Sequence, residues 1–306
     1  MLFDRVASLV IGKEGKQGRE LAGLRFSFSI EKQSTKAPNK CTLRVWNLAP
    51  ETRGLVEAIG NVLILKAGYV QDTGAQTIFQ GDVIRALTVR EGPDWVTELE
   101  MQDGHKEFRD TKASVSYGRG ATALQVLGDL SKRFGLPVRE LPADVAAKQY
   151  PNGFAFAGRL RDAMEKACDY LKLEWSIQNR EIQIIKKGGV FQKRAVVLSP
   201  DTGMVESPML ESKTMTEKAA AKEGITANQP GVRVTTQRND DGEIKRVLQV
   251  NGYKVKSLLQ PGLEPGGYVQ IKSKSIDGKF FRIEELTHVG DTHGSEWHTN
   301  LTLRFV

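Results

Sequence analysis

LRFSFSI, residues 24–30, alternates apolar and polar side chains along its whole length. The apolar members are Leu24, Phe26, Phe28 and Ile30. A repeat of two is the period of a β-strand, whose successive side chains point to opposite faces. A strand with this pattern turns one face to a core and the other to water, as in antiparallel sheets. The stretch therefore predicts an antiparallel sheet near the start of the chain.

Further strand patterns fill the rest of the first hundred residues. They are CTLRVWNL (41–48), NVLILKAGY (61–69), QTIFQGDVIRALTVR (76–90) and WVTELEMQDG (95–104). In the last of these, alternation directs Trp95, Thr97, Leu99 and Met101 inward. Pro50 suits the first position of a short helix, and Gly60 suits its end. We expect residues 1–108 to form an all-β sandwich or barrel.

The middle of the chain, residues 109–189, predicts a small α/β domain. Residues 121–137 and 158–175 have apolar side chains three or four positions apart, the spacing of amphipathic helices. The two stripes are Leu124, Leu127, Leu130, Phe134 and Leu160, Met164, Ala167, Cys168, Leu171. LEWSIQ and EIQIIKK follow as a hairpin around Asn179-Arg180, a weaker turn signal than Asn-Gly.

The last third, residues 190–306, predicts a second β domain. Its polar stretch 211–250 indicates an extended hairpin or mobile loop, helix-permissive at first and then two strands around Asp240-Asp241-Gly242. A three-stranded meander follows, with turns at Asp277-Gly278 and 290–296. Its final strand places Trp297, Thr299, Leu301, Leu303 and Phe305 on one face. The fold class is mainly β, with two antiparallel barrels flanking the α/β part.

Charge and cysteine content exclude several classes of protein. The net charge is +7, and its surplus lies mostly in residues 109–189, which have 14 Lys and Arg against 9 Asp and Glu. These charges are interspersed, which favours a solvated surface over a phosphate-binding stripe.

Cys41 and Cys168 lack CxxC spacing, so no disulfide framework is expected, and Cys168 falls on the apolar helix stripe. No apolar run approaches ~18 residues, so we expect no membrane insertion and a chain made in a reducing cytoplasm.

Three histidines are the strongest candidates for a metal site. His288, His293 and His298 are evenly spaced near Asp291, and such residues can bind zinc or iron. Their spacing matches neither HExxH nor a zinc finger. The meander places His288 on the face of Arg282 and Glu284, His293 in a turn, and His298 opposite the Trp297 face. Polar histidines on a strand and in a turn are the preferred interpretation, and the metal site is the alternative.

Other patterns of catalytic or binding sites are incomplete. IGKEGKQGRE lacks Walker spacing because Gln17 follows Lys16, so a hairpin tip is favoured. SYGRGAT lacks GxGxxG and is typical of a loop before a helix. Glu284-Glu285 is the densest acidic pair near an aromatic strand, but neighbouring strand residues point to opposite faces. No GxSxG elbow occurs. We expect no catalytic residue, metal or cofactor.

Nucleic-acid binding by base stacking would need exposed aromatics among basic residues. Phe280-Phe281-Arg282 and Tyr253-Lys254-Val255-Lys256 have that composition. Strand segments with one buried and one solvated face account for both more simply.

The order of several phrases resembles one protein family. LRVWNLAPETRGLVEAIG, NVLILKAGY and IFQGDVI resemble the N-terminal domain of the hub proteins of contractile-tail phages, including relatives of the phage Mu hub. GATALQVLGDLSKRFGLPV is similar to their next element, and residues 257–305 are similar to their ending. The polar stretch 211–250 is longer than the usual connection in that family.

This resemblance implies a structural protein of the virion tail baseplate, assembled in the host bacterial cytoplasm. It implies a homotrimer with two tube-like barrels per subunit, which would join a sixfold tail tube to a threefold central spike. Implied partners are the spike and the tail tube or its distal initiator, with tape measure and baseplate wedge proteins as further candidates and DNA only in transit. The basic surplus of residues 109–189 would then face acidic partner surfaces. The alternatives are a tail-associated peptidoglycan hydrolase and a nucleic-acid-binding module.

Overall fold

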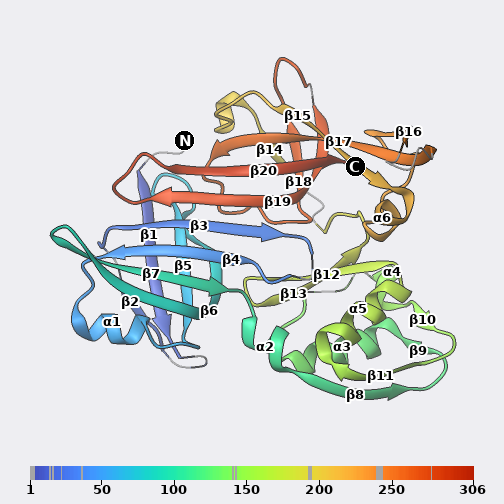
Figure 1. The fold of residues 1–306 in the computed structure, drawn as a ribbon, viewed down its shortest axis with the longest axis horizontal. Helices are drawn as coiled ribbons and strands as arrows, with labels where there is room; N and C mark the ends of the chain where they lie inside the picture. Colours follow the sequence, from blue (N-terminus) through green and yellow to red (C-terminus); the bar gives the residue numbers. More distant parts are fainter. Residues whose placement is uncertain are drawn as a thin grey trace.

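The computed structural model describes residues 4–13, 15, 17–21, 23–35, 37–139, 141, 143–191, 195–238, 244–276 and 278–306. Lys16, Asp277 and the Asp240-Asp241-Gly242 turn lie outside the described residues. Within them, most strands belong to one large, mainly antiparallel sheet, in which only β14 and β18 pair in parallel, and a small group of helices and short sheets forms the middle of the chain (Figure 1). The predicted fold class, mainly β with a small α/β part, is confirmed.

The described residues of the N-terminal region form seven strands and one short helix. They are β1 (Arg5–Gly12), β2 (Arg19–Leu21), β3 (Phe26–Gln33), β4 (Lys40–Trp46), α1 (Pro50–Val56), β5 (Val62–Tyr69), β6 (Gly74–Glu91) and β7 (Asp94–Gln102). β6 pairs first with β5 and then with β7, and Asp82 is opposite a residue of each. A bulge between Val83 and Arg85 follows directly, and bulges bend a strand. β6 is therefore the strand at which the sheet bends, so that β1 and β5 cross behind β3 and β4 (Figure 1).

Where the structure describes the middle region, it contains four helices and three two-stranded sheets. They are α2 (His105–Asp110), β8 (Lys112–Tyr117), β9 (Ala121–Thr122), α3 (Ala123–Phe134), α4 (Ala143–Ala146), β10 (Gln149–Tyr150), β11 (Phe154–Arg159), α5 (Leu160–Tyr170), β12 (Leu173–Gln178) and β13 (Glu181–Lys186). Thr122 caps α3 with a capping box to Gln125. Gly135 ends α3 in the left-handed region at φ 74°. The predicted hairpin β12–β13 is confirmed.

The C-terminal region contains the remaining strands. They are β14 (Val196–Leu198), a 3₁₀ turn (Pro200–Thr202), β15 (Met209–Thr216), α6 (Glu217–Lys222), β16 (Val232–Arg238), β17 (Ile244–Leu258), β18 (Tyr268–Ile271), β19 (Lys279–Asp291) and β20 (Trp297–Phe305). The predicted meander is confirmed, since β18 pairs with β19 and β19 with β20. In the polar stretch 211–250 the extended hairpin is confirmed as β16–β17, but its first part is strand β15 before it becomes helix α6.

One strand pair joins the two β regions. β3 pairs with β19 over seven residues, from Gln33 opposite Glu285 to Ser27 opposite Asp291. The sheet order is β15-β17-β20-β19-β3-β4-β7-β6-β5-β1-β2. Strands from opposite ends of the sequence are thus neighbours, and the two β regions share one backbone hydrogen-bond network.

The buried apolar side chains fall into separate cores. One lies among β1 to β7, a second among the middle elements from Ala113 to Ile184, and a third among β14 and β17 to β20. Leu259 and Trp297 of the C-terminal region belong to the first core. The domain boundaries at 108/109 and 189/190 stay a prediction.

Two predicted core positions are wrong. Trp95 is 44% exposed and lies under the Arg53 guanidinium, 5.1 Å from the ring centre, whereas Thr97, Leu99 and Met101 are buried. Leu124 is 58% exposed, because the face of α3 that packs inward is centred on Ala123, Leu127 and Leu130. In both cases the side chain stands at the margin of an element, where periodicity alone does not decide burial. The second helix stripe and buried Cys168 are confirmed.

The seam between β3 and β19 depends on buried side chains, which gives a test of stability. Ile30 is fully buried on β3, opposite His288 of β19. We expect Ile30→Ala to lower the free energy of unfolding by about 2–5 kcal/mol, because it leaves a cavity in the core. Urea denaturation followed by tryptophan fluorescence measures this. Ile59→Ala, at an exposed position, is the control and should change the value by about 0.5 kcal/mol or less. Equal effects of the two substitutions would contradict the packing at the seam.

Candidate functional site at the junction of the three regions

The tip of the β12–β13 hairpin is an unusual turn. Asn179 and Arg180 both have positive φ, 53° and 62°, as a type I′ turn requires. Asn tolerates this conformation, but an arginine there costs on the order of 1 kcal/mol. A turn of this kind persists where its surroundings hold it. Here the surroundings are a set of polar side chains from all three regions, with Glu107 on α2 of the middle region itself, which we call the socket: Lys32, Asn39, Asp82, Asp103, Glu107 and Glu264.

Asp103 binds the backbone of the turn. Its two carboxylate oxygens accept hydrogen bonds from the backbone N–H groups of Asn179 and Arg180, at 2.6 and 2.7 Å. The residue follows β7 and is completely buried. Burial raises the pKa of this carboxyl to about 7, although the Arg180 N–H and the Lys32 ammonium favour the charged form. One side chain therefore satisfies both outward donors of the turn.

The Arg180 side chain binds two acids of the N-terminal and middle regions. Nη1 donates to Asp82 Oδ1 at 2.9 Å, and Nη2 donates to Glu107 Oε1 at 2.7 Å. All three side chains are nearly or fully inaccessible to solvent. Because Asp82 lies at the corner of β6 and Glu107 on α2, the guanidinium connects the hairpin tip to both. Charges buried this deeply need partners, since removing one leaves the others uncompensated.

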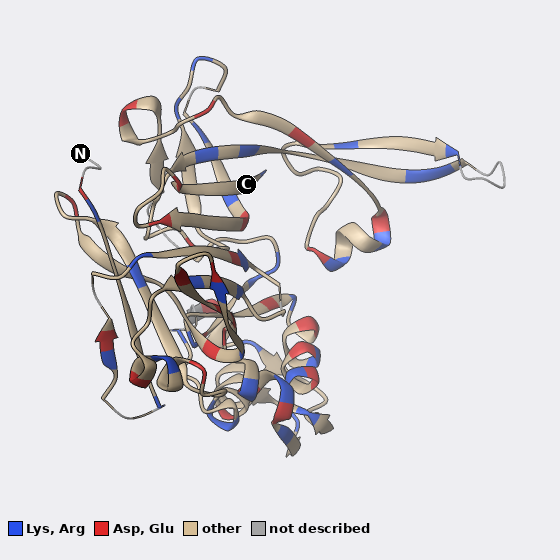
Figure 2. Cartoon of the chain, turned by 60° about the vertical axis from the view of Figure 1, so that its left-hand side comes forward, with Lys and Arg blue, Asp and Glu red and all other residues tan. Residues whose placement is uncertain are grey.

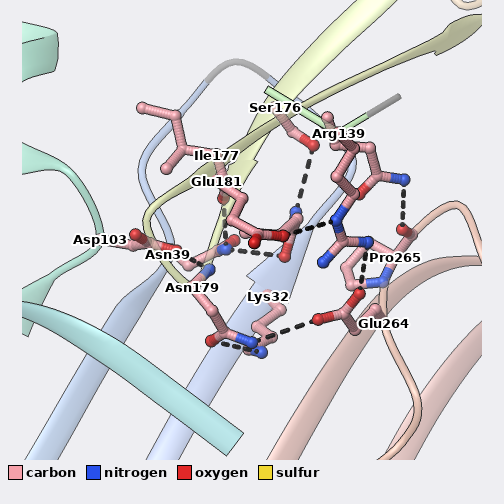
Figure 3. A network of polar contacts seen from close by, with 12 residues as sticks. Lys32, Asn39, Asp103, Arg139, Ser176, Ile177, Asn179, Glu181, Glu264 and Pro265 are labelled. Atoms are coloured by element: carbon pink, nitrogen blue, oxygen red, sulfur yellow. Dashed lines mark hydrogen bonds and ion pairs between the residues drawn. The ribbon is translucent and has the colours of Figure 1, made fainter. Parts of the chain in front are cut away.

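The Asn179 side chain extends the contact to the C-terminal region. Its Oδ1 accepts from Lys32 Nζ at 3.1 Å, and its Nδ2 donates to Glu264 Oε1 at 3.2 Å (Figure 3). Arg139 Nη1 lies 2.7 Å from Glu264 Oε2. Burial lowers the pKa of Lys32, and the negative charges of Glu264 and Asp103 oppose that shift. Burial raises the pKa of Glu264, but Lys32 and Arg139 outweigh it and hold that pKa below its ordinary value.

Asn39 fixes the hairpin strand that enters the socket. Its Nδ2 donates to the carbonyl of Ile177 at 2.8 Å and to Gln178 Oε1 at 2.9 Å (Figure 3). Gln178 Nε2 in turn donates to the carbonyl of Gln33 at 2.9 Å. The strand ends of β3 and β12 are thereby joined by side-chain amides, which supply both donors and acceptors.

A second buried ion cluster joins the middle region to the C-terminal sheet. Arg282 of β19 is almost completely buried and pairs with Glu174 of β12. Glu284 Oε1 lies 3.3 Å from Arg282 Nε and 3.0 Å from Arg304 Nη2. Burial raises the pKa of Glu174 and lowers that of Arg304. A cleft of about 770 Å³ opens beside this cluster, between α5 and β12 on one side and β15, α6, β17 and β20 on the other.

The buried ion pairs and hydrogen bonds of the socket are suited to holding the three regions together, and they offer little for catalysis. In the socket each acidic group is bound by a cation or by backbone donors, and each cation is bound by acids or amides. Such a network fixes one relative placement of three chain segments, because any other placement would leave buried charges without partners.

The structure does not bring the three candidate histidines together. His288 is buried, with Nδ1 2.8 Å from Thr299 Oγ1, and burial lowers its pKa to about 3. His293 is exposed in the turn, and His298 Nδ1 pairs with Glu296 at 2.8 Å. His298 is opposite Val289 and His288 is opposite Thr299, so the two rings lie on opposite sheet faces. Among the described residues no group of three or more His, Cys, Asp and Glu could hold a metal ion.

A β-bulge overturns two further predictions about faces. The pairing of β19 with β20 shifts between Ile283 and Glu285, which inserts Glu284 as an extra residue. His288 therefore lies on the core face with Ile283 and Leu286, and not on the face of Arg282. Glu284 and Glu285 line the same cleft and do not point to opposite faces. Glu284 is held by two guanidinium groups, so it is a member of an ion pair and a poor candidate for an acid catalyst.

The residues of the other candidate binding sites take part in aromatic packing, ion pairs and ordinary loops. Tyr253 and Phe281 pack against each other edge to face, 5.4 Å between ring centres, and Lys254 and Lys256 pair with Glu211 and Glu206. Phe280 stacks on Tyr268. The predicted hairpin tip lies between β1 and β2, and SYGRGAT leads into α3. No helix in the described part of the chain is long and apolar enough to cross a membrane.

Sequence reasoning missed the socket. Its members are spread from Lys32 to Glu264, and each sits among ordinary strand or loop residues. The one available signal was the turn itself, since an Arg at a position that needs positive φ indicates an external partner.

The fold has relatives among solved structures, although no protein-family model and no curated protein matches the sequence. The chain is similar to the 43 kDa tail protein of prophage MuSo2 from Shewanella oneidensis, with 10% identity, a TM-score of 0.63, and 98% of each chain covered. A tail protein from Neisseria meningitidis MC58 matches with 10% identity and a TM-score of 0.64, over 99% of this chain and 97% of that one.

A third similar structure comes from a secretion system. It is an Escherichia coli component of the type VI secretion system, itself structurally similar to the bacteriophage T4 tail proteins gp27 and gp5. The identity is 12% and the TM-score 0.58, over 97% of this chain and 76% of that one. The tail-protein fold that the sequence resemblance implied is thus confirmed, along nearly the whole chain.

The ion pairs of Arg180 lead to a prediction on stability. Arg180→Met should lower the free energy of unfolding by about 3–5 kcal/mol, because Asp82 and Glu107 are left buried without their cation. The triple variant with Asp82→Asn and Glu107→Gln should recover part of that loss, since the uncompensated charges are gone. Urea denaturation measures both. Arg85→Met, which breaks an exposed pair with Glu100, is the control, with an expected loss of about 1 kcal/mol or less. A triple variant less stable than the single one would contradict the socket.

The buried carboxyl of Asp103 leads to a prediction on pH. Its pKa is about 7 in the folded chain, against an ordinary value of 3.8, so the folded state holds the proton more tightly than the unfolded state. This group should therefore make the free energy of unfolding fall as pH rises from about 4 to 7, by at most about 1.4 kcal/mol per pH unit. Denaturation curves at several pH values measure the slope. Asp103→Asn should remove this contribution to the pH dependence of the free energy of unfolding. Asp72→Asn, at an exposed position, should leave that contribution unchanged. An unchanged slope in Asp103→Asn would show that Asp103 does not titrate in this range.

Proposed function

We propose that this chain is the structural hub of a phage tail baseplate, in which three copies form a ring that joins a sixfold tail tube to a threefold central spike. The observation that carries the proposal is the similarity to phage tail proteins over 98% of both chains. A match of that extent includes all three regions and their order. The shared feature is then the whole arrangement, and not one common module.

The two β regions suit a symmetry adaptor. Each chain has one β region around the core of β1 to β7 and another around the core of β14 and β17 to β20. Three copies would present six such regions to a sixfold tube, while the threefold repeat would match the spike. Pairing of β3 with β19 fixes the two regions of one chain next to each other.

The buried junction suits a part that bears load. The turn at Asn179-Arg180 is held by residues of all three regions, so a force on one region is passed to the others through many short polar contacts. A hub needs this rigidity while it holds the spike, and the ring would open a channel for the genome only when the spike leaves. In this role the chain acts through its contacts with other copies and with tail proteins, and it catalyses no reaction.

The proposed partners are proteins of the tail. They are the central spike, the tail tube or its distal initiator, and the tape measure and baseplate wedge proteins, with DNA only in transit through the virion baseplate. The surplus of Lys and Arg in residues 109–189 would face acidic surfaces of these partners. Lys112 and Arg159 support this, because they lie opposite each other on β8 and β11 and are both exposed.

The oligomeric state tests the proposed function. Light scattering after size-exclusion chromatography should show three times the chain mass of 33.9 kDa, either for the chain alone or after addition of the spike and tube proteins of the same tail. Electron micrographs should then show rings with threefold symmetry and six similar lobes. A chain that stays monomeric with both partner proteins present would overturn the hub assignment.

A further inference from the structure

A lysine occupies a core position at the end of β3. The inward side chains of this strand are those of Phe26, Phe28, Ile30 and Lys32. Lys32 is only 2% exposed, and it lies opposite Leu286 of β19, which is itself a core residue. Lysine is almost never buried this completely unless a partner compensates its charge. The partner of Lys32 is therefore informative.

That partner is a side-chain amide. Lys32 Nζ donates to Asn179 Oδ1 at 3.1 Å, and this hydrogen bond goes to an amide where a carboxylate would be the ordinary choice. Burial lowers the pKa of Lys32, although the charges of Glu264 and Asp103 oppose that shift. Burial of a lysine favours the neutral amine, which unlike the ammonium is a nucleophile.

A carboxylate lies on the other side of the same amide. Asn179 Nδ2 donates to Glu264 Oε1 at 3.2 Å, and Arg139 Nη1 holds Glu264 Oε2 at 2.7 Å (Figure 3). The orientation of the amide follows from its neighbours, because a lysine offers only donors and a carboxylate only acceptors. The carbonyl oxygen therefore faces Lys32, and the nitrogen faces Glu264. An amine, an amide carbon and a proton carrier are thus neighbours in the socket.

We propose that Lys32 and Asn179 become joined by an isopeptide bond, with Glu264 as the catalytic residue. Lys32 Nζ attacks Asn179 Cγ, so that the Nζ–Cγ bond forms and the Cγ–Nδ2 bond breaks. Glu264 accepts the proton that Nζ loses and passes it to Nδ2, which leaves as ammonia. An amine and a primary amide give a secondary amide and ammonia, so the step needs no oxidant, reductant or further reactant.

The surroundings favour this reaction. Two groups held in contact within one fold react far faster than the same groups in solution. Cγ is bonded directly to Oδ1, so a small rotation of the Lys32 side chain brings Nζ over it. Asp103 binds the Asn179 backbone at 2.6 Å and keeps the amide in place. The core around Lys32 excludes water, which would otherwise compete as the nucleophile.

The charge of Glu264 suits its role. Lys32 and Arg139 hold the pKa of this carboxyl below its ordinary value, although burial opposes them. Glu264 therefore begins as a carboxylate, which can accept a proton from the attacking nitrogen. Its hydrogen bond to Nδ2 places the accepted proton beside the leaving nitrogen.

The bond would join two regions that are far apart in the sequence. Lys32 lies on β3 of the N-terminal region, and Asn179 lies at the tip of the β12–β13 hairpin. The β16–β17 hairpin projects away from the body of the molecule (Figure 2), and β17 is connected through β20 and β19 to β3. A force on that hairpin reaches Lys32 along paired strands, and a covalent amide transmits it to the middle region without dissociating. The reaction occurs once in each chain and converts no external substrate.

The mass of the denatured chain tests the bond. The wild-type chain should be lighter than its sequence by one ammonia. Its tryptic digest should contain a branched peptide that joins residues 26–36 to residues 173–180, uncut after Lys32. Glu264→Gln and Lys32→Met should have the full mass of their sequences, whereas Lys40→Met, at an exposed position on the neighbouring strand, should still lose ammonia.

Two results of the mass measurement would overturn the proposal. One is a wild-type chain with the full mass of its sequence. The other is a loss of ammonia confined to a single unbranched peptide, since that change is a succinimide at an asparagine and joins no two segments. Neither measurement depends on oligomeric state, so failure of this proposal and failure of the hub assignment are distinguishable.

A cleaved chain tests the bond by a second route. A protease site inserted in the exposed turn between Pro151 and Asn152 puts Lys32 and Asn179 on different fragments after cleavage. In SDS with a reducing agent, the two fragments should migrate as one band. The same chain with Glu264→Gln should give two bands. Two bands from both chains would overturn the isopeptide bond.

Discussion

The structure depends on one buried carboxylate. Asp103 accepts the backbone N–H groups of Asn179 and Arg180 and so stabilises a turn in which an arginine adopts positive φ. The Arg180 guanidinium can then reach Asp82 and Glu107, and the Asn179 amide can lie between Lys32 and Glu264. These contacts support one another, because a buried charge without its partner costs several kcal/mol. A hydrophobic contact would allow the three regions to slide, whereas this network has one satisfied arrangement.

The pairing of the strands is a second constraint on how the regions of the chain are placed. Two long strands, β6 and β19, each pair with different neighbours along their length. Both contain a bulge near the point where the partner changes, which bends the strand and shifts the faces of the residues beyond it. In β6 the bulge follows Asp82, so the corner of the sheet and an anchor of the socket coincide. In β19 it brings Glu284 between Arg282 and Arg304. The ion clusters therefore lie where the sheet is irregular.

Much of the fold follows from periodicity, and its failures have a common cause. The alternation of residues 24–30 correctly predicts β3, and the stripe from Leu160 to Leu171 correctly predicts the buried face of α5. Prediction failed for Trp95 and Leu124, which stand at the ends of elements, and for His288 and Glu285, which follow a bulge. Hydrophobic period describes a regular element in isolation. It contains no information on where a neighbouring strand ends or where a bulge inserts an extra residue, because tertiary contacts determine both.

The sequence by itself determined the class of the fold, the order of the β, α/β and β regions, and the resemblance to tail hub proteins, because these depend on local period and on the order of short motifs. Only the tertiary structure decided that β3 pairs with β19, that the Asn179-Arg180 turn enters a socket built from residues 32 to 264, and that β15 and β16 have no second neighbouring strand among the described residues. These features depend on pairs of residues far apart in the chain. A buried ion pair or a strand register leaves almost no trace in either partner's local sequence, since each half is an ordinary charged or strand residue until the other half is placed beside it.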